Sequence, residues 1–161
     1  GATGPAGPQG PQGPAGPTGA TGPAGPQGPS GVIAMTFSSG SGSVTTNLAF
    51  IGPVATVSVP STSHRVHITA SHALGSTSAA GAGALNLWVC YRLSGGPISQ
   101  LGGGTFGLRT VQNTRNHYSL SAVTSTLTAG TYDVGLCGQS SDAANWNNNE
   151  WGYVSAFVAQ L

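Results

Sequence analysis

The chain begins with GATGPAGPQGPQGPAGPTGATGPAGPQGPSG, residues 1–31, in which glycine occupies every third position from Gly1 to Gly31. Proline follows the glycine in eight of the ten triplets, and the segment has no charged side chain. Three polyproline-II strands can wind around one axis only where every third residue lacks a side chain, because nothing larger fits at the centre. A linker that is merely rich in glycine and proline has no reason to keep this spacing. The period therefore predicts a triple helix of the collagen kind.

The predicted triple helix should be weak by itself. The third position of each triplet holds threonine, alanine, glutamine or serine and never proline, so hydroxyproline cannot stabilise it there. Ion pairs between chains cannot take over this role, because the first charged side chain of the sequence is Arg65. A rod on the order of 90 Å long must also offset the translational cost of bringing three chains together. We expect another part of the chain to make the trimer.

Charged residues are scarce along the whole chain, and this narrows its partners. The sequence has four arginines, no lysine and three acidic residues, so that 4% of it is charged, against about 25% in ordinary globular proteins. No basic cluster is present, and we expect no nucleic-acid partner. No apolar run approaches the roughly 18 residues of a membrane-spanning helix, so we also expect no membrane span.

The pattern changes at Val32, which divides the chain into two predicted domains, 1–31 and 32–161. In the second domain, short β-rich runs alternate with clusters of glycine, serine, asparagine and proline. The expected strands are 32–37, 44–50, 54–59, 64–74, 84–93, 98–101, 105–111, 117–127, 130–138 and 150–161. About ten strands in a domain of about 130 residues predict an all-β jelly-roll sandwich with its own core.

A glycine-triplet rod followed by a compact β domain resembles a known family, the collagen-like proteins with a jelly-roll head of the complement-head or tumour-necrosis-factor type. The bacterial and phage collagen-like fibre proteins are its most similar members. The resemblance is carried by ALNLWVCYRL (84–93), LTAGTYDVGLCG (127–138) and WGYVSAFVAQL (151–161). It implies a homotrimeric head whose three-fold axis continues the axis of the rod. It also implies an extracellular location, on a bacterial cell or spore surface or in a virion fibre.

Together, the residues and the resemblance predict a structural protein of an extracellular fibre. The head would trimerise and set the register of the triple helix, because joining three chain ends converts a three-body encounter into a local event at high effective concentration. Further assembly of the trimers into filaments is left open. The alternative function is a head that binds a surface glycan or a receptor.

Two cysteines, Cys90 and Cys137, lie inside predicted strands, each on the face opposite the apolar residues of its strand. An even number of cysteines in an extracellular chain favours one disulfide, and closing a loop of this length would stabilise the fold by about 4 kcal/mol. Two unpaired thiols are the alternative.

The sequence predicts no enzyme, no cofactor and no metal site. The familiar nucleophile, zinc and phosphate-loop motifs are absent. The histidines of HRVHITASH do not converge on a strand, because His64 and His72 share one face and His67 points to the other. The sequence contains three acidic residues, Asp133, Asp142 and Glu150.

The loop SSDAANWNNNEWGY, residues 140–153, is the most distinctive stretch of the head. It places Trp146 and Trp151 among asparagines that include Asn147 and Asn149. Aromatic rings beside side-chain amides suit sugars, since rings contact C–H faces and amides pair with hydroxyls. In the structural alternative, the tryptophans fill the end of the sandwich or a subunit interface. A third reading is a calcium site that uses Asp142 and Glu150.

The rod offers sites for modification as well. Thr3, Thr18 and Thr21 occupy the outward third position of their triplets. Spore-surface collagen-like proteins often carry O-linked sugars at such positions, and the resemblance implies the same here.

Overall fold

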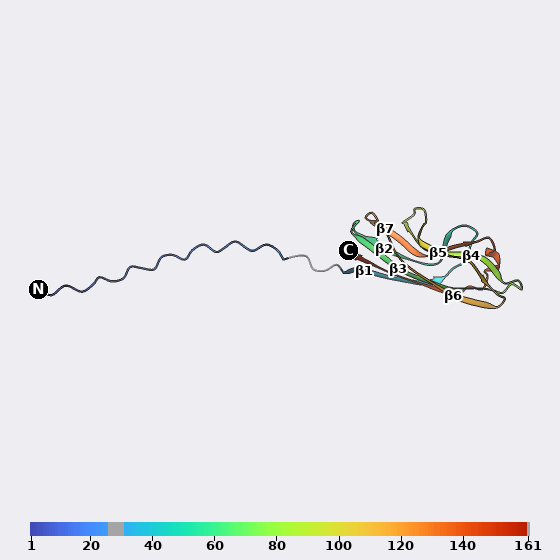
Figure 1. Ribbon diagram of the computed structural model, residues 1–161, viewed down its shortest axis with the longest axis horizontal. Coiled ribbons are helices and arrows are strands. Elements are labelled where there is room, and N and C mark those ends of the chain that lie inside the picture. Colours follow the sequence, from blue (N-terminus) through green and yellow to red (C-terminus); the bar gives the residue numbers. More distant parts are fainter. Residues whose placement is uncertain (26–30, 161) are drawn as a thin grey trace.

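The computed structural model describes residues 1–25 and 31–160. Residues 26–30, which belong to the predicted triple-helical tract, and Leu161, the end of the predicted last strand, lie outside the described residues. Residues 1–25 form no helix or strand and are all exposed, and Figure 1 shows them as an extended chain. A triple helix needs two further chains, so that part of the fold stays a prediction.

The described residues 31–160 form an all-β sandwich, as expected, with eight strands in place of the predicted ten. A short 3-10 helix, η1, precedes the last strand. The elements are β1 (Val32–Ser41), β2 (Ala49–Val59), β3 (His64–Ser76), β4 (Ala82–Leu93), β5 (Ser99–Thr110), β6 (Thr114–Val123), β7 (Gly130–Ser140), η1 (Ala143–Asn145) and β8 (Trp151–Gln160).

The number of strands was predicted wrongly because proline and glycine interrupt long strands without ending them. The predicted strands 44–50 and 54–59 meet in β2, whose register against β7 shifts between Phe50 and Val54. Pro53 lies in this interval and has no N–H to donate to the ladder. The predicted strands 98–101 and 105–111 are joined in β5 through the successive glycines 102–104, beside repeated register shifts against β4. Such irregularities bend a strand locally.

The strands form two four-stranded antiparallel sheets. The first sheet has the order β1-β8-β3-β6 and the second has the order β2-β7-β4-β5. Every connection between successive strands crosses from one sheet to the other, except for the β4–β5 hairpin. This connectivity gives the sandwich a jelly-roll-like topology.

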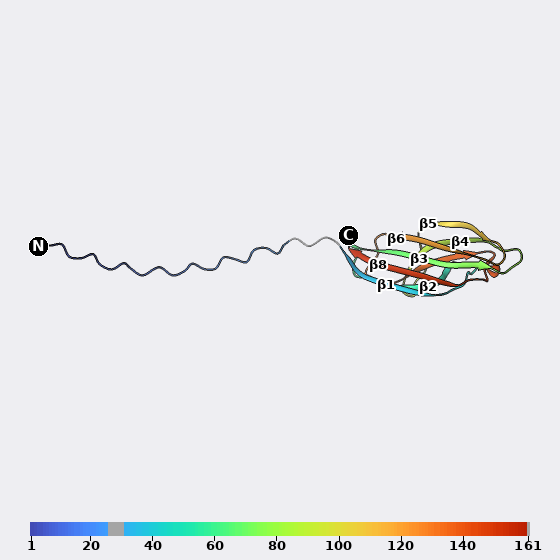
Figure 2. The same ribbon diagram turned by 90° about the horizontal axis from the view of Figure 1, so that it is seen from below.

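Both ends of the described domain lie at the same end of the sandwich. The backbone N–H of Gln160 donates to the carbonyl of Gly31, and Val32 pairs with Ala159. Figures 1 and 2 show the end of β8 beside the start of β1. We call this end the proximal end. The loops that precede β4, β6 and β8 lie at the opposite, distal end.

The core lies between the two sheets and follows the alternation of the strands. In β3, every second residue from Val66 to Leu74 is buried, and the residues between them are not. Other fully buried side chains come from both sheets, among them Ile51, Val59, Leu85, Leu87, Val134, Leu136, Val154 and Val158. Burying one such side chain stabilises the fold by about 1.5–3 kcal/mol. The core thus accounts for a head that folds as a single chain.

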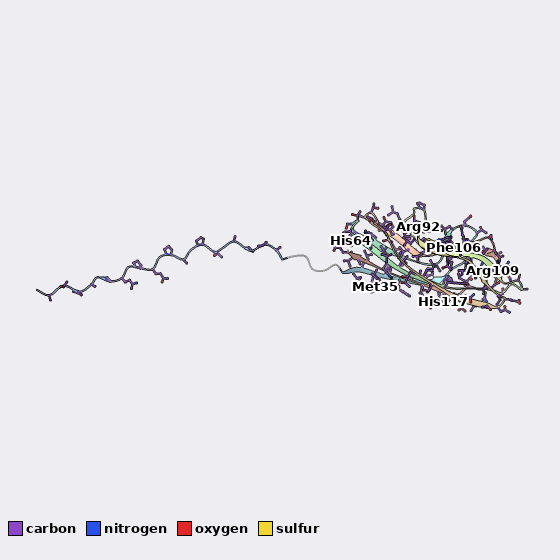
Figure 3. The ribbon with its side chains drawn as sticks, viewed as in Figure 1. Met35, His64, Arg92, Phe106, Arg109 and His117 are labelled. Atoms are coloured by element: carbon purple, nitrogen blue, oxygen red, sulfur yellow. A yellow bond between two sulfur atoms is a disulfide. The ribbon has the colours of Figure 1, made fainter. Side chains whose placement is uncertain are left out.

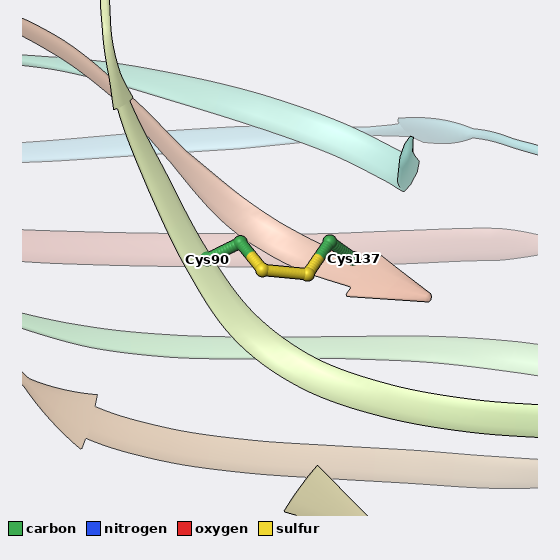
Figure 4. Close-up of a disulfide and its surroundings, with 2 residues drawn as sticks. All are labelled: Cys90 and Cys137. Carbon is green, nitrogen blue, oxygen red and sulfur yellow. A yellow bond between two sulfur atoms is a disulfide. The ribbon is translucent and has the colours of Figure 1, made fainter. Parts of the chain in front are cut away.

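A second, smaller cluster lies on the outer side of the second sheet. There Cys90 of β4 and Cys137 of β7 form a disulfide (Figure 4), with 5.7 Å between their Cα atoms. Both residues are fully buried beside Trp88, and Phe50 packs against them. Of the two states that the sequence left open, the structure has the bridge. It ties together two neighbouring strands in the middle of the second sheet.

Candidate functional site

The outward-facing side of the first sheet is built from alternate residues of its four strands. Antiparallel pairing aligns these residues in four rows that run across β1, β8, β3 and β6. The rows are Met35, Phe157, His67 and Val123; Phe37, Ser155, Thr69 and Ser121; Ser39, Tyr153, Ser71 and Ser119; and Ser41, Trp151, Ala73 and His117. We call these sixteen residues the outer face.

Large apolar side chains of the outer face are left in water by the single chain. Met35 is 77% exposed, Phe37 64% and Trp151 58%, and Val123 and Tyr153 are also exposed. Met35 lies near the proximal end of β1, as Figure 3 shows. Isolated exposed apolar residues are normal, but several on one sheet face mark a surface that meets another molecule.

The outer face carries no aspartate, glutamate, lysine or arginine. The nearest arginines lie one row beyond it, Arg65 at the proximal end and Arg115 at the distal end. Arg65 donates to the backbone carbonyls of Thr62 and His64, and Arg115 forms an ion pair with Glu150. The outer face therefore combines exposed large apolar side chains with hydroxyl side chains, and charged residues occur only beyond its two end rows.

Contacts within the outer face hold its rings in place. The rings of Phe37 and Tyr153 stack with their centroids 6.3 Å apart. The imidazole of His67 stacks on Phe157 at 4.7 Å. Side chains that are ordered before binding lose less conformational entropy when a partner covers them.

On the opposite face of the sandwich, on the second sheet, large side chains are covered by their neighbours to a greater extent. Asp133 forms an ion pair with Arg92, with 2.9 Å between Oδ2 and Nε. The Arg92 guanidinium in turn lies 5.5 Å from the centre of the Phe50 ring. Trp88 is buried next to the disulfide, and Phe106, although 62% exposed, packs its ring edge-on against Trp88. This face has both charge and a local cover, unlike the outer face of the first sheet.

The loop predicted to bind sugars does not present its two tryptophans together. Trp146 is buried in the core, where its indole N–H donates to the carbonyl of Gly83, so its ring cannot stack on a ligand. Trp151 is exposed, but it belongs to the outer face of the first sheet. A sugar site that uses both rings is therefore contradicted by the burial of Trp146, which instead packs in the core as the alternative interpretation expects.

The loop asparagines fasten the loop to the end of β3. The Asn147 side-chain oxygen accepts hydrogen bonds from the N–H and hydroxyl of Thr77. Asn149 accepts from the N–H of Gly75 and donates to the carbonyl of Trp146. These amides satisfy backbone groups that the strand end leaves unpaired. Their side chains serve the fold of the loop, and the expected role in sugar binding is not supported by this geometry.

The histidines lie as the alternation predicts. His64 and His72 are buried on the inner face of β3, while His67 lies on the outer face. The His72 ring occupies space left by two glycines, since a methyl group at Gly52 or Gly152 would lie 2.5 or 2.8 Å from its Cδ2 atom. Its Nδ1 donates to the carbonyl of Ala73, while Nε2 is buried without a partner among the described residues. Burial lowers the pKa of His72, and the nearby His117 lowers it further.

The acidic residues are spread over the head and engaged in local contacts. Asp133 pairs with Arg92, and Glu150 pairs with Arg115. Asp142 accepts hydrogen bonds from the N–H of Gly83 and from Asn145. In the part of the chain that the structure describes, no three histidine, cysteine or acidic side chains gather as metal ligands. Asp142 and Glu150 thus make separate local contacts, and a calcium site that combines them with loop carbonyls stays a prediction.

In the described part of the rod, the single chain gives no local reason for the glycine period. A methyl group placed on any of the glycines from Gly1 to Gly25 would meet no atom within 4 Å. Thr3, Thr18 and Thr21 are exposed there, as modification would require. Across the described residues, no helix is long and apolar enough to cross a membrane.

Comparison with known proteins leaves the family open. No family model and no curated protein matches the chain. Among solved structures, the CBM22-1 xylan-binding domain of Paenibacillus barcinonensis Xyn10C is 13% identical, with a TM-score of 0.34, over 76% of this chain and 70% of that chain. Family 16 Carbohydrate Binding Module-2 is 10% identical, with a TM-score of 0.25, over 71% of this chain and 68% of that one. Both TM-scores are too low for these similarities to bear on function.

Proposed function

We propose that the chain is the subunit of a homotrimeric, collagen-like structural protein of an extracellular fibre. In this proposal, three heads associate through the outer face of the first sheet, and residues 1–31 of the three chains wind into a triple helix. The observation that carries the proposal is the uncharged outer face, with exposed large apolar side chains on β1 and β8, in a head that directly follows a glycine-triplet tract. The role is structural and needs no catalytic group or cofactor.

The glycine period supports a multi-chain rod. Each triplet glycine of the described segment has open space around it in the single chain. Neither packing nor backbone conformation within one chain therefore requires glycine there, whereas the centre of a triple helix does. In the proposal, this requirement for glycine comes from two further chains of the same kind.

The position of the outer face supports the division of labour between head and rod. The chain enters the head at Gly31, directly before β1, and Met35 and Phe37 lie in the first six residues of β1. Association of three heads through β1 and β8 would bring three residues 31 close together. The three tracts would then begin winding from a common point at high effective concentration.

The mass of the protein in solution tests this proposal. We expect sedimentation equilibrium to give a trimer for the full chain and for residues 31–161, and a monomer for residues 1–31 at the same concentration. Circular dichroism should show the collagen signal only in the full chain. A monomeric head, or a tract that trimerises equally well without the head, would refute the proposed division of labour.

Recognition of a surface glycan or receptor is the second candidate function. It is favoured by an open cleft of about 680 Å³ at the distal end of the head, away from the point where the rod enters. Cleft sizes of this order are typical of small-molecule sites. A rod that holds a head away from a surface would present this end to the surroundings. Binding of the labelled full chain to a glycan array would test the recognition role, and a chain that binds nothing on the array would have only the structural one.

A further inference from the structure

The cleft at the distal end is lined by small residues and by polar side chains. We define this distal cleft by residues 80–84 together with Arg109, Asn116, Asp142 and Asn145. Residues 80–84 are alanines and glycines only. Figure 3 shows Arg109 near the end of the head that lies farthest from the rod.

Arg109 is the arginine whose charge the fold leaves unused. The other three arginines of the chain all donate hydrogen bonds within the head, and two of them form ion pairs. Within residues 1–25 and 31–160, neither a hydrogen bond nor an ion pair is formed by the Arg109 side chain. Its guanidinium presents a planar fork of donors that matches a carboxylate in two-point contact.

Asp142 faces the same space and is held in a fixed orientation. Its Oδ2 accepts from the N–H of Gly83 at 2.8 Å, and its Oδ1 accepts from the Asn145 amide at 2.6 Å. A methyl group at Gly83 would lie 3.7 Å from Cγ of Arg109 and 4.0 Å from Oδ2 of Asp142. The two side chains therefore both lie close to this glycine, and the described residues show no ion pair between them.

The remaining lining groups suit a ligand with many hydroxyls. Each Asp142 oxygen keeps a lone pair free after its single recorded bond, and carboxylate oxygens accept strongly from hydroxyl groups. The Asn116 amide group donates to the Tyr118 hydroxyl at 3.3 Å, which leaves its carbonyl oxygen as a further acceptor. With Val111 as the one large apolar side chain of the lining, the cleft suits a polar ligand better than an apolar one.

We propose that the distal cleft binds an acidic sugar, whose carboxylate pairs with Arg109 and whose hydroxyls donate to Asp142 and Asn116. This inference rests on the second proposed role, recognition by the head, and does not depend on the structural role. The cleft volume exceeds the needs of a single inorganic anion and accommodates one or two sugar rings. Affinity per site is expected to be low, because no aromatic ring lines the cleft, and three copies in a trimer would raise it through avidity.

Titration of the full chain with N-acetylneuraminic acid and glucuronic acid, followed by NMR shifts of the arginine side chains, tests the proposal. Glucose serves as the neutral probe and inorganic phosphate as the bare anion. The variant is Arg109→Gln, and the matched control is Arg65→Gln, which removes the same charge at the proximal end. We expect an acidic sugar to shift the signals of Arg109 in the parent protein. Loss of a charge-assisted, two-point contact should raise Kd by roughly 10- to 100-fold in Arg109→Gln and leave it unchanged in Arg65→Gln.

The outcomes separate this inference from the recognition role itself. Binding of phosphate as strong as that of the acidic sugars would overturn the assignment to a sugar. Equal losses in both variants would show a general charge effect and overturn the assignment to the cleft. Array glycans that bind equally well to the parent and to Arg109→Gln would overturn the cleft while leaving recognition in place. If no glycan binds at all, both ideas fail.

Discussion

Replacing Phe37 by alanine should weaken the trimer without unfolding the head. The Phe37 ring is 64% exposed in the single chain and contributes little to the core. It lies in the second row of the outer face, beside Tyr153, whose ring it stacks on. If three copies meet through this face, the ring is buried on assembly. Phe37→Ala should therefore reduce the free energy of association and leave the stability of the folded head nearly unchanged.

The size of the effect follows from the exposed part of the ring. Full burial of a phenylalanine side chain is worth about 1.5–3 kcal/mol, so covering the exposed two-thirds of Phe37 is worth about 1–2 kcal/mol per subunit. A symmetric trimer repeats the loss three times, which gives about 3–6 kcal/mol per trimer. This corresponds to roughly two to four powers of ten in the trimer dissociation constant.

Phe106→Ala is a matched control, because Phe106 is 62% exposed but belongs to the second sheet. Sedimentation equilibrium over a range of concentrations measures the mass of both variants, and thermal unfolding of the β signal measures the stability of each head. We expect dissociation of Phe37→Ala at concentrations where the parent protein and Phe106→Ala stay trimeric. Equal trimer stability in both variants would show that the outer face is not the interface. Equal weakening would show that the loss of an exposed ring acts in some unspecific way.

Three further perturbations test separate parts of the argument. Gly16→Ala should lower the melting temperature of the collagen signal in circular dichroism, because the glycine would lie at the crowded axis of the triple helix. Ala15→Ser should leave this temperature nearly unchanged, and equal melting temperatures of the two variants would contradict a triple helix. Lowering the pH below about 6.5 should destabilise the head, because burial depresses the pKa of His72 in the folded state and the unfolded chain takes up the proton first. Denaturant unfolding at several pH values should show the free energy of unfolding falling as the pH is lowered in the parent, and most of this dependence should be lost in His72→Gln. An unchanged dependence in the variant would assign it to other groups. Replacing Cys90 and Cys137 together by alanine should cost up to about 4 kcal/mol of unfolding free energy, measured against the parent with and without a reductant; a reductant that also destabilises the double variant would be acting elsewhere.

Much of the head could be predicted from its strands because alternation reports burial directly. The inner face of β3, with Val66 and Ile68, was evident from HRVHITASHAL, since every second residue had to enter the core. The same reasoning placed His67 outside and Cys90 opposite the apolar side of β4. Strand number was harder, because Pro53 reads as a boundary in the sequence although the chain continues through it as a bulge.

The outer face could not be read from the sequence with the same ease. In VIAMTF, apolar residues occur at consecutive positions, and a sequence does not say which face a neighbouring sheet will cover. Ala34 and Phe37 are both exposed, and only the pairing of β1 with β8 places Phe37 on the outer face beside Tyr153. The signal that could have found the face is β8, where Trp151 and Tyr153 alternate with the buried Gly152 and Val154.

The loop before β8 shows why residue type alone misassigned a site. Tryptophan and asparagine have the same chemistry whether they bind a sugar or hold a loop, and only burial separates the two uses. The indole N–H of Trp146 found a carbonyl inside the head, and the asparagines found the free backbone groups at the end of β3. Arg109 was overlooked because a single arginine in a strand does not suggest a binding site by its type. Only the structure shows that it lines a cleft and that its neighbours leave it unpaired.

The scarcity of charge fits an assembly with three-fold symmetry. Around a symmetry axis each side chain meets its own copies, so that one carboxylate or guanidinium near the axis would be brought together with two like charges. The sequence has seven charged residues, and all of them lie outside the sixteen positions of the outer face. Within that face, the large apolar side chains are concentrated on β1 and β8, whereas Val123 is the one large apolar side chain that β3 and β6 contribute. If three heads associate as proposed, this asymmetry would place β1 and β8 nearest the axis, on the side where the rod begins.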